Sequence, residues 1–257
     1  MRRLLLAAVW FLAPMAALAA ESAISLDHAP VLREDPVALQ RGARTFVHYC
    51  LTCHPASLVR YNRLEDLGFT EQQIKQDLLP EGRRIGDPMT VAMRRGDAKR
   101  WFNVMPPDLS LEVRARTSTA APGRDWVYSY LRGFYRDTAR PSGWNNVVYP
   151  NVAMHHVLYG LQGIQTLGPD HKLTLAHPGS LSPAQYDATV ADLVAFLEFA
   201  AEPAAPLRRH LGVFVLGATA LLLVFAFALK PPPRRRRAAP RHAQAATAPS
   251  AGGRSDP

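Results

Sequence analysis

The feature that most constrains this chain of 257 residues is the run Cys50, Leu51, Thr52, Cys53, His54, which contains both of its cysteines. Two cysteines three positions apart lie on one face of a helical turn, so both thiols can reach the same flat ligand. A histidine directly after the second cysteine can then coordinate a metal at the centre of that ligand. This spacing is the attachment pattern of c-type haem. The sequence therefore predicts one covalent haem on Cys50 and Cys53, with His54 as an axial iron ligand.

Three other interpretations of this run explain its residues less well. A thioredoxin-like dithiol is expected after a β-strand and needs no histidine after the second cysteine. A zinc site needs a second pair of ligands, and the chain has no further cysteine to supply one. A simple disulfide, common in exported proteins, leaves His54 without a role. Haem attachment uses all three side chains.

The iron of such a haem needs a sixth ligand, for which thioether and imidazole are the usual groups. The candidates outside the N-terminal leader are Met89, Met93, Met105, Met154, His155 and His156. Met93 lies in an Arg-rich segment where ordinary packing is the simpler role, and Met105 precedes two prolines. Met154 lies in a long loop-like segment, and long loops in compact domains usually have a functional reason. Chemistry alone favours Met154, with the two histidines as alternatives.

The N-terminal residues 1–20 have the features of a secretory signal peptide. Arg2 and Arg3 precede an apolar run, and the small residues around Ala17 and Ala19 suit a signal peptidase. The apolar run is shorter than the roughly 20 residues that span a bilayer. A retained anchor is therefore the weaker alternative, and the sequence predicts an exported domain at residues 21–207.

A second apolar segment predicts a membrane anchor near the C-terminus, at residues 208–230. Leu211 to Leu229 is uncharged and long enough to cross the hydrocarbon core. Two basic residues lie in the fifteen positions before it and six in the fifteen positions after it. By the positive-inside rule the C-terminus is cytoplasmic and the main domain lies outside the cytoplasmic membrane. A buried core helix is the alternative for a segment so uniformly apolar.

The formal net charge of +9 is concentrated at the chain ends. Residues 21–207 contain 19 Lys and Arg against 20 Asp and Glu, so this part is almost neutral. Residues 231–257 carry Arg234 to Arg237 within a stretch rich in Ala, Pro, Gly and Ser, which predicts a disordered cytoplasmic tail. Its charges fix the topology and contact anionic lipid. Nucleic-acid binding is excluded as a function.

The fold class predicted is mostly α, a cytochrome c-like haem domain with long loops followed by one transmembrane helix. Helices are expected at residues 36–49, 125–135 and 182–201, and Thr70 to Gln73 resembles a capping box. The 182–201 helix has a second capping box, from Ser182 to Gln185. Residues 141–178 are rich in Gly, Pro, Asn and His, so a loop is expected there. No sustained strand alternation is present.

Two further runs of sequence carry a family resemblance. They are Met105, Pro106, Pro107, Asp108, Leu109, Ser110 followed by Val113, Arg114, Ala115, Arg116, and the pair Ala153 and Met154. A helix ending Ala200, Ala201, Glu202, Pro203 before one span completes the pattern. With these features the chain resembles bacterial cytochrome c1, the haem subunit of the cytochrome bc1 complex, over nearly all of the exported domain and the anchor. The Pro-Pro-Asp-Leu-Ser run with Arg-Ala-Arg is far more specific than the haem pentapeptide alone.

The resemblance implies one haem c, with His54 and Met154 as its two axial ligands. It also implies that Arg116 pairs with a haem propionate, and a solvated surface arginine is the alternative. Trp126 stands where the family leads us to expect a tyrosine near the propionates. Many relatives have prolines after the axial methionine, whereas this chain has histidines, so His155 stays a rival ligand.

The function implied is electron transfer. By resemblance the haem takes an electron from the Rieske iron-sulfur protein and passes it to a soluble cytochrome c, while the cytochrome b subunit handles the quinol. The protein is then an electron-transfer subunit and not a catalyst on its own, in the bacterial inner membrane with its haem domain in the periplasm. The alternatives are a c-type subunit of a terminal oxidase or reductase and, in another class, a tethered thiol-disulfide oxidoreductase.

Overall fold

The computed structural model describes residues 25–30, 33–91 and 93–230 of the chain. The predicted signal peptide at residues 1–20 and the predicted tail at residues 231–257 lie outside the described residues. The chain divides into two compact units after Ala205, and each unit is described by itself.

Helices make up most of the regular structure, in agreement with the predicted class. In chain order they are α2 (Pro36–Thr45), η2 (Phe46–Cys50), η3 (Tyr61–Leu67), α3 (Glu71–Gln73), η4 (Ile74–Leu78), α4 (Arg95–Phe102), α5 (Glu112–Ala115), α6 (Gly123–Arg132), α7 (Tyr159–Gln162), α8 (Pro183–Ala201) and α9 (Ala205–Leu229). The strands are β1 (Ala56–Arg60), β2 (Pro88–Met89), β3 (Phe134–Arg136), β4 (Trp144–Asn146), β5 (Gly163–Leu167) and β6 (Leu173–Pro178).

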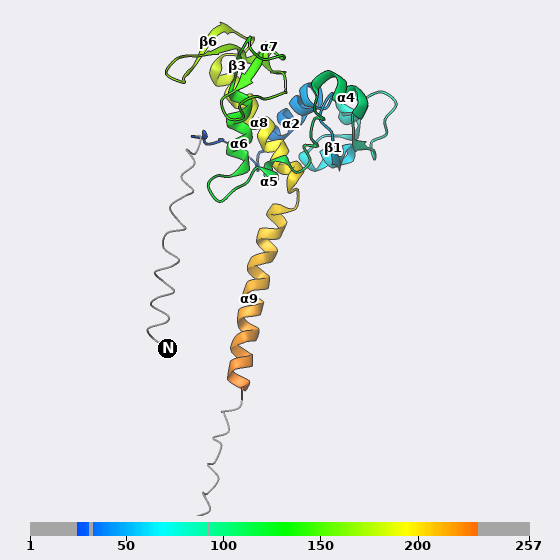
Figure 1. Cartoon of the computed structure of the whole chain (residues 1–257). Helices are drawn as coiled ribbons and strands as arrows, with labels where there is room; N and C mark the ends of the chain where they lie inside the picture. Colours follow the sequence, from blue (N-terminus) through cyan, green and yellow to red (C-terminus); the bar gives the residue numbers. More distant parts are fainter. Residues whose placement is uncertain (1–24, 31–32, 92, 231–257) are drawn as a thin grey trace, which may run out of the picture. The chain divides into compact units, whose positions relative to one another are not determined.

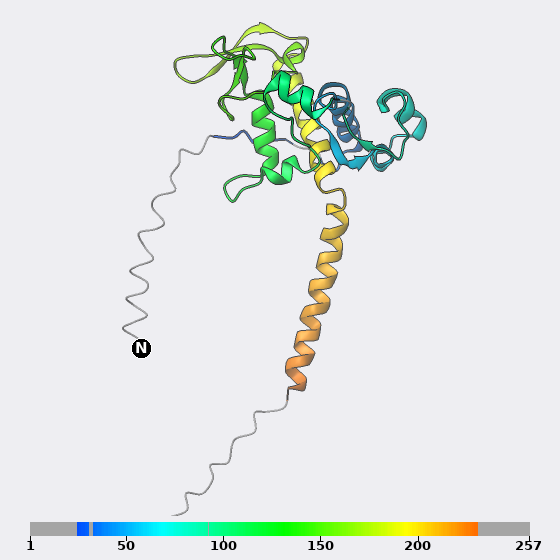
Figure 2. The same ribbon diagram turned by 45° about the vertical axis from the view of Figure 1, so that its right-hand side comes forward.

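The core of the first unit forms where α2 and α6 pack against α8, and Figures 1 and 2 show α6 and α8 side by side. The ring centroids of Phe46 and Phe196 lie 5.4 Å apart at the contact between the α2–η2 helix and α8. Gly42 lets the two backbones approach, because a Cβ there would lie 2.0 Å from the carbonyl oxygen of Asp192. Asp192 also binds the Arg41 guanidinium, with an Nε to Oδ2 distance of 2.6 Å.

Both predicted capping boxes are confirmed. Thr70 accepts a hydrogen bond from the backbone N–H of Gln73, and the Gln73 side chain bonds the Thr70 N–H in return. Ser182 and Gln185 do the same at the start of α8. The helix predicted at 182–201 is therefore confirmed, and the 36–49 helix is present as α2 continued by the π-helix η2. The 125–135 helix begins earlier and ends at Arg132, after which the chain enters β3.

The prediction of an unbroken loop at residues 141–178 is wrong. This segment contains β4, α7, β5 and β6, and strands pair antiparallel as β1 with β2, β3 with β4, and β5 with β6. Hydrophobic alternation arises only when one face of a strand is buried. In the β5–β6 hairpin nearly all side chains are exposed or half-buried, so that signal is missing. Figures 1 and 2 place this hairpin at one end of the unit, with α4 and β1 at the other.

The second unit contains α9, whose stretch His210–Leu229 has a mean hydropathy of 2.5. It is the one helix among the described residues that is long and apolar enough to cross a membrane. Its apolar side chains are exposed, which is unfavourable in water and favourable in lipid. The prediction of one C-terminal transmembrane helix agrees with this finding.

Candidate haem site

The two cysteines lie on one compact turn at the end of the α2–η2 helix. The Leu51 N–H donates to the carbonyl of Phe46, five residues back, which is the π-helical pattern often found at functional sites. The Cys50 carbonyl then accepts two hydrogen bonds, from the N–H of Cys53 at 3.0 Å and from that of His54 at 2.8 Å. These bonds fold the pentapeptide back on itself, so both thiols and the imidazole belong to one rigid turn.

The thiols of this turn are free and poorly ionised. Cys50 is 8% exposed and Cys53 is half-buried, and neither forms a disulfide. Burial, with a smaller effect of the neighbouring Cys53, raises the pKa of the Cys50 thiol to about 12. Burial also raises the pKa of Cys53. Reactive redox dithiols have a lowered thiol pKa, so this environment is the opposite of theirs.

His54 has one ring nitrogen bound and the other available. Its Nδ1 lies 2.9 Å from the carbonyl oxygen of Pro107, and a carbonyl only accepts, so Nδ1 carries the proton. Burial lowers the pKa of His54, although the bond to Pro107 and the charge of Glu112 act in the opposite direction. The imidazole is therefore neutral at pH 7, with its Nε2 lone pair free for a metal. A second partner on the other nitrogen is the usual arrangement of a metal-binding histidine.

The Pro-Pro-Asp-Leu-Ser run holds the Pro107 carbonyl in place by docking on the residues that follow His54. The Leu109 N–H donates to the Pro55 carbonyl at 2.8 Å. The Ser57 N–H donates to Oδ2 of Asp108 at 3.1 Å, and the Ser57 hydroxyl donates to the same oxygen. The Leu58 N–H donates to Oγ of Ser110 at 3.0 Å. The two motifs that the sequence separates by some fifty residues therefore form one hydrogen-bonded unit.

Asp108 is ionised within this unit. Its partial burial opposes ionisation, but hydrogen bonds from Ser110 and Ser57 outweigh it and hold the pKa of the carboxyl below its ordinary value. Its Oδ1 accepts from the Ser110 N–H at 2.8 Å, an Asx-type turn that aligns the serine hydroxyl with the Leu58 N–H.

Met154 lies beside Tyr130, whose hydroxyl donates to its Sδ at 3.3 Å. The methionine is half-buried and packs against Phe134, Trp144 and Val152. Burial raises the pKa of the Tyr130 phenol well above its ordinary value, so the group stays protonated and remains a donor. A thioether whose second lone pair can face a metal is thus presented at a fixed position.

Two buried asparagines of β4 shape the loop that leads to Met154. Oδ1 of Asn146 accepts from the N–H of Val148 at 2.8 Å and of Tyr149 at 3.1 Å, while its Nδ2 donates to the Tyr130 carbonyl at 2.7 Å. Oδ1 of Asn145 accepts from the Asn151 N–H at 2.8 Å. The methionine loop and α6 are therefore joined through side-chain amides.

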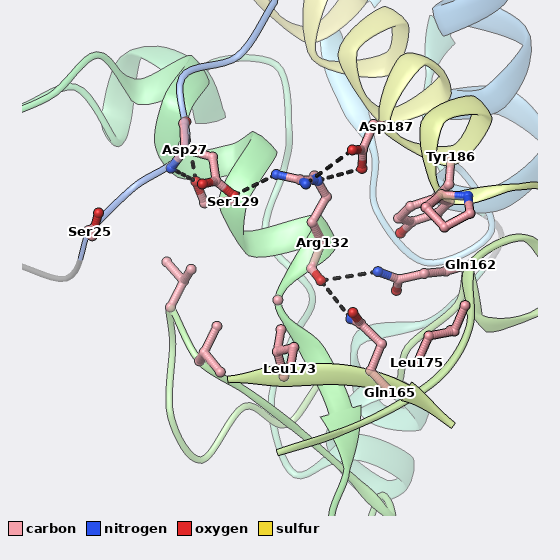
Figure 3. A pocket seen from close by; sticks show the side chains of 14 residues that line it. Ser25, Asp27, Ser129, Arg132, Gln162, Gln165, Leu173, Leu175, Tyr186 and Asp187 are labelled. Carbon is pink, nitrogen blue, oxygen red and sulfur yellow. Dashed lines mark hydrogen bonds and ion pairs between the residues drawn. The ribbon is translucent and has the colours of Figure 1, made fainter. Parts of the chain in front are cut away.

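The end of α6 is fixed by a second network, drawn in Figure 3 around a cavity of about 430 Å³. Arg132 binds Asp187 of α8 through two nitrogens, at 2.6 and 3.1 Å, and contacts Asp27 through a third. Its carbonyl accepts from the side chains of Gln162 and Gln165, at 3.1 and 2.9 Å. This anchors α6 two residues beyond Tyr130.

Arg116 lies between Glu112 and the aromatic residues that surround Met154. Its Nε donates to Glu112 at 2.7 Å, and its guanidinium stands 4.0 Å from the centroid of the Trp126 ring, which stacks on Tyr130 at 5.0 Å. The charge of Glu112 acts on both His54 and Tyr130. Arg116 therefore belongs to the same series of contacts as the Tyr130–Met154 pair. The terminal nitrogens of Arg116 bind no other described residue.

The other candidate ligands have different surroundings. Met89 is fully buried in the core, and Met93 and Met105 line a cavity together with Pro107. His155 is exposed, with its ring 5.8 Å from that of Phe102 in α4. His156 is 2% exposed and stacks on Phe134 at 4.9 Å, and burial lowers its pKa to about 4.

Three contributors were missed by sequence reasoning: the Pro107 carbonyl, Tyr130 and Asn146. Pro107 was recognised only as part of a motif, because no local pattern tells which carbonyl a distant histidine will face. Tyr130 lies in an aromatic helix, where no local pattern marks it as a partner of Met154. The described residues hold no group of three or more His, Cys, Asp or Glu side chains able to bind a metal ion.

Comparison with known proteins gives consistent matches along most of the chain. A model described as the Cytochrome C1 family matches residues 28–80 and 83–235. An ammonia monooxygenase gamma subunit of Nitrosomonas europaea is 48% identical over 206 residues, covering 80% of this chain and 86% of the relative. A cytochrome c1 of Allochromatium vinosum is 42% identical over 242 residues, covering 90% and 97%. A cytochrome c1 of Rhodospirillum rubrum is 28% identical over 224 residues, covering 77% and 81%.

Proposed function

Because this chain belongs to the cytochrome c1 family, we propose that it is the monohaem electron-transfer subunit of a cytochrome bc1 complex. Family membership makes it a c-type cytochrome, and α9 is its candidate membrane span. In the proposed complex it receives electrons from the Rieske iron-sulfur protein, passes them to a soluble cytochrome c and is held beside the cytochrome b subunit. The observation that carries this proposal is the His54 imidazole, bound through Nδ1 to Pro107 and open at Nε2.

The residues present fit a covalently attached haem. Cys50 and Cys53 lie on one turn as unpaired thiols, and His54 has the tautomer that an axial ligand needs. A bound haem c would supply a one-electron redox couple. The chain itself supplies axial donors, burial and orientation, and its site needs no acid-base group.

Met154 is the proposed second axial ligand. Its sulfur is held by Tyr130, whose ring stacks on the Trp126 ring that the Arg116 guanidinium covers. Met105 is the weaker candidate, since it lines a cavity with Pro107, and Pro107 binds the Nδ1 of His54, the nitrogen that is not available to a metal. The His156 ring stacks on Phe134 and meets Trp144 edge-on, which fits a packing role.

Arg116 remains the proposed partner of a haem propionate. Stacking on Trp126 and the bond to Glu112 orient the guanidinium and use only its Nε. The two terminal nitrogens then have a fixed orientation, which suits the binding of a carboxylate. Replacement of Arg116 by Gln is expected to lower the reduction potential, because a positive charge near the haem favours the reduced, less positive iron.

The proposed topology places the first unit in the periplasm and the C-terminus in the cytoplasm of a bacterium. The support is the distribution of basic residues, two before and six after the apolar segment. An exported location also suits covalent attachment, because a haem lost outside the cell is difficult to replace.

The experiment that tests the proposal is purification of the protein from membranes in mild detergent. We expect a reduced-minus-oxidised spectrum of haem c, retained after denaturation and acid-acetone extraction, together with copurifying cytochrome b and Rieske subunits. A haem that is extracted by acid-acetone would contradict covalent attachment. Copurification with a haem-copper oxidase instead would contradict the assignment to a bc1 complex.

A second candidate assembly is favoured by one specific observation, the 48% identity to a chain named as a gamma subunit of ammonia monooxygenase. The same tethered cytochrome could serve another membrane oxidase or reductase. The purification above separates the two candidates, since monooxygenase subunits in place of cytochrome b would identify the second.

A tethered thiol-disulfide oxidoreductase is the weakest candidate. Burial raises the thiol pKa of both cysteines, whereas a redox dithiol needs a thiolate near neutral pH. Alkylation after reduction distinguishes the two functions. Thioether-bonded cysteines take up no reagent, and a reducible pair takes up two equivalents.

A further inference from the structure

We propose that Tyr130 is a positioning residue for the axial thioether: its hydroxyl holds the sulfur of Met154 and tunes how strongly that sulfur donates to the iron. The inference rests on the proposed function, because it takes Met154 as the sixth ligand. It concerns a group that the haem motif and the family pattern do not mark, and it follows from one contact between α6 and the methionine loop.

The contact has a defined direction. The Tyr130 hydroxyl oxygen lies 3.3 Å from Sδ of Met154, and a thioether has no hydrogen to give, so the tyrosine is the donor. The thioether sulfur carries two lone pairs. One lone pair accepts the hydrogen bond from the hydroxyl, and the other is left available for a metal.

The tyrosine itself is held on several sides. Its ring stacks on Trp126, at 5.0 Å and an interplanar angle of 10°, and meets Phe134 edge-on at 5.2 Å. Its carbonyl accepts from Asn146, the residue that also binds the Val148 and Tyr149 N–H groups of the methionine loop. A side chain fixed in this way can fix the sulfur that it binds.

The chemical consequence concerns the reduction potential. A hydrogen bond to the sulfur withdraws electron density from it and makes it a weaker donor. Ferric iron depends more on that donation than ferrous iron does, so the bond favours the reduced state. Hydrogen bonds to ligand atoms are a known means by which proteins tune metal sites.

Tyr186 provides a matched control. It is buried where Tyr130 is half-buried, and its hydroxyl donates to the backbone carbonyl of Leu131, next to Tyr130, at 2.9 Å. Replacing either residue with Phe removes one hydroxyl and one hydrogen bond from the same part of the core. Only Tyr130 contacts the sulfur, so a general packing defect and a ligand effect can be separated.

The test compares the wild type with Tyr130→Phe, Tyr186→Phe and Met154→Leu in the membrane-purified holoprotein. Tyr130→Phe is expected to keep the methionine-linked absorbance band and to lower the reduction potential. At a fixed applied potential the ratio of reduced to oxidised haem should fall by up to about fivefold, the equivalent of one neutral hydrogen bond. Exogenous imidazole should also displace the sulfur from the ferric haem less readily, because without the hydrogen bond the sulfur is the stronger donor. Tyr186→Phe should leave both properties unchanged while lowering the thermal midpoint.

Each outcome has a separate meaning. An unchanged potential and imidazole affinity in Tyr130→Phe overturn the inference, as do equal shifts in Tyr186→Phe. If Met154→Leu retains the methionine-linked band, the proposed axial ligand is wrong and the inference falls with it. Should Tyr130→Phe fail to fold, the iron–sulfur stretching band of the wild type is compared in H2O and D2O. A shift supports the hydrogen bond to sulfur, and no shift overturns it.

Discussion

The His54 side and the Met154 side of the site are held by different kinds of contact. On the His54 side, backbone groups and short polar side chains of two motifs bind one another, as in the Pro107 carbonyl and the Ser57–Asp108 pair. On the Met154 side, aromatic rings stack in series and one phenol contacts the sulfur. The first side is a compact set of local turns, and the second is a loop supported from a helix.

Because their contacts differ, the two sides should tolerate amino-acid substitutions to different degrees. A network of hydrogen bonds fixes the position of each of its groups, and the removal of one group leaves its partners unpaired and displaces them. An aromatic assembly relies on area and shape, and it adjusts to a substitution by small shifts. We therefore expect the His54 side to determine whether haem is held, and the Met154 side to determine its redox properties.

The largest effect is expected from removing the axial ligands one at a time. His54→Ala should abolish the low-spin haem c spectrum, because the imidazole is fixed beside the attachment cysteines. Met154→Leu should retain covalent haem, lose the methionine-linked band and lower the potential. The measurements are a pyridine haemochrome assay and a redox titration. Equal loss of haem in both variants would remove the proposed division between the two sides.

A large effect on stability is expected where the His54 side joins the core. Gly42→Ala places a Cβ 2.0 Å from the Asp192 carbonyl oxygen, so α2 and α8 have to separate. We expect a loss of about 3 kcal/mol in the free energy of unfolding, the upper range for overpacking. Urea unfolding measures it. Gly96→Ala in α4, where nothing lies within 4 Å, is the control and should lose nothing.

A smaller effect is expected on the Met154 side from Asn146→Ala. The side chain is 1% exposed, and its loss leaves two loop N–H groups without their acceptor. We expect the free energy of unfolding to fall by about 2 kcal/mol. Proteolysis between β4 and α7 should also become faster. Asn62→Ala, at an exposed position, serves as the control. If the two variants are cut at the same rate, the amide does not hold the methionine loop.

The smallest effect is a pH dependence on the His54 side. Hydrogen bonds from Ser110 and Ser57 hold the pKa of Asp108 below its ordinary value of 3.8 despite partial burial. The unfolded chain therefore binds a proton more readily, so the stabilisation is present above about pH 4 and is lost as the pH falls through the lower folded value. Asp108→Asn should weaken the acid dependence of unfolding between pH 5 and pH 3. An identical slope in wild type and variant would contradict this.

The sequence marks the His54 side more clearly than the Met154 side. Cys50 to His54 is contiguous, and its spacing itself expresses the chemistry, while the capping boxes at Thr70 and Ser182 are local signals that the structure confirms. The fold class and the apolar C-terminal helix were predictable for the same reason.

The remaining features depend on contacts between distant residues. Tyr130 and Met154 are 24 residues apart, and nothing in either neighbourhood marks the pair. The β5–β6 hairpin was missed because its strands bury no continuous face, so the alternation that identifies a strand is absent. The hairpin is hidden from sequence analysis because its strands are exposed. The Tyr130–Met154 contact is hidden because it joins a helix to a distant loop.

The packing of α2 against α8 also sets an order of events during synthesis. Arg41 and Asp192 are 151 residues apart, so α2, which leads to Cys50, lacks its main packing partner until α8 has been made. With α8 in place the Cys50 thiol is buried. We therefore expect haem attachment to Cys50 to precede this packing, while the thiol is still accessible. The arrival of α8 then limits the time in which Cys50 can react.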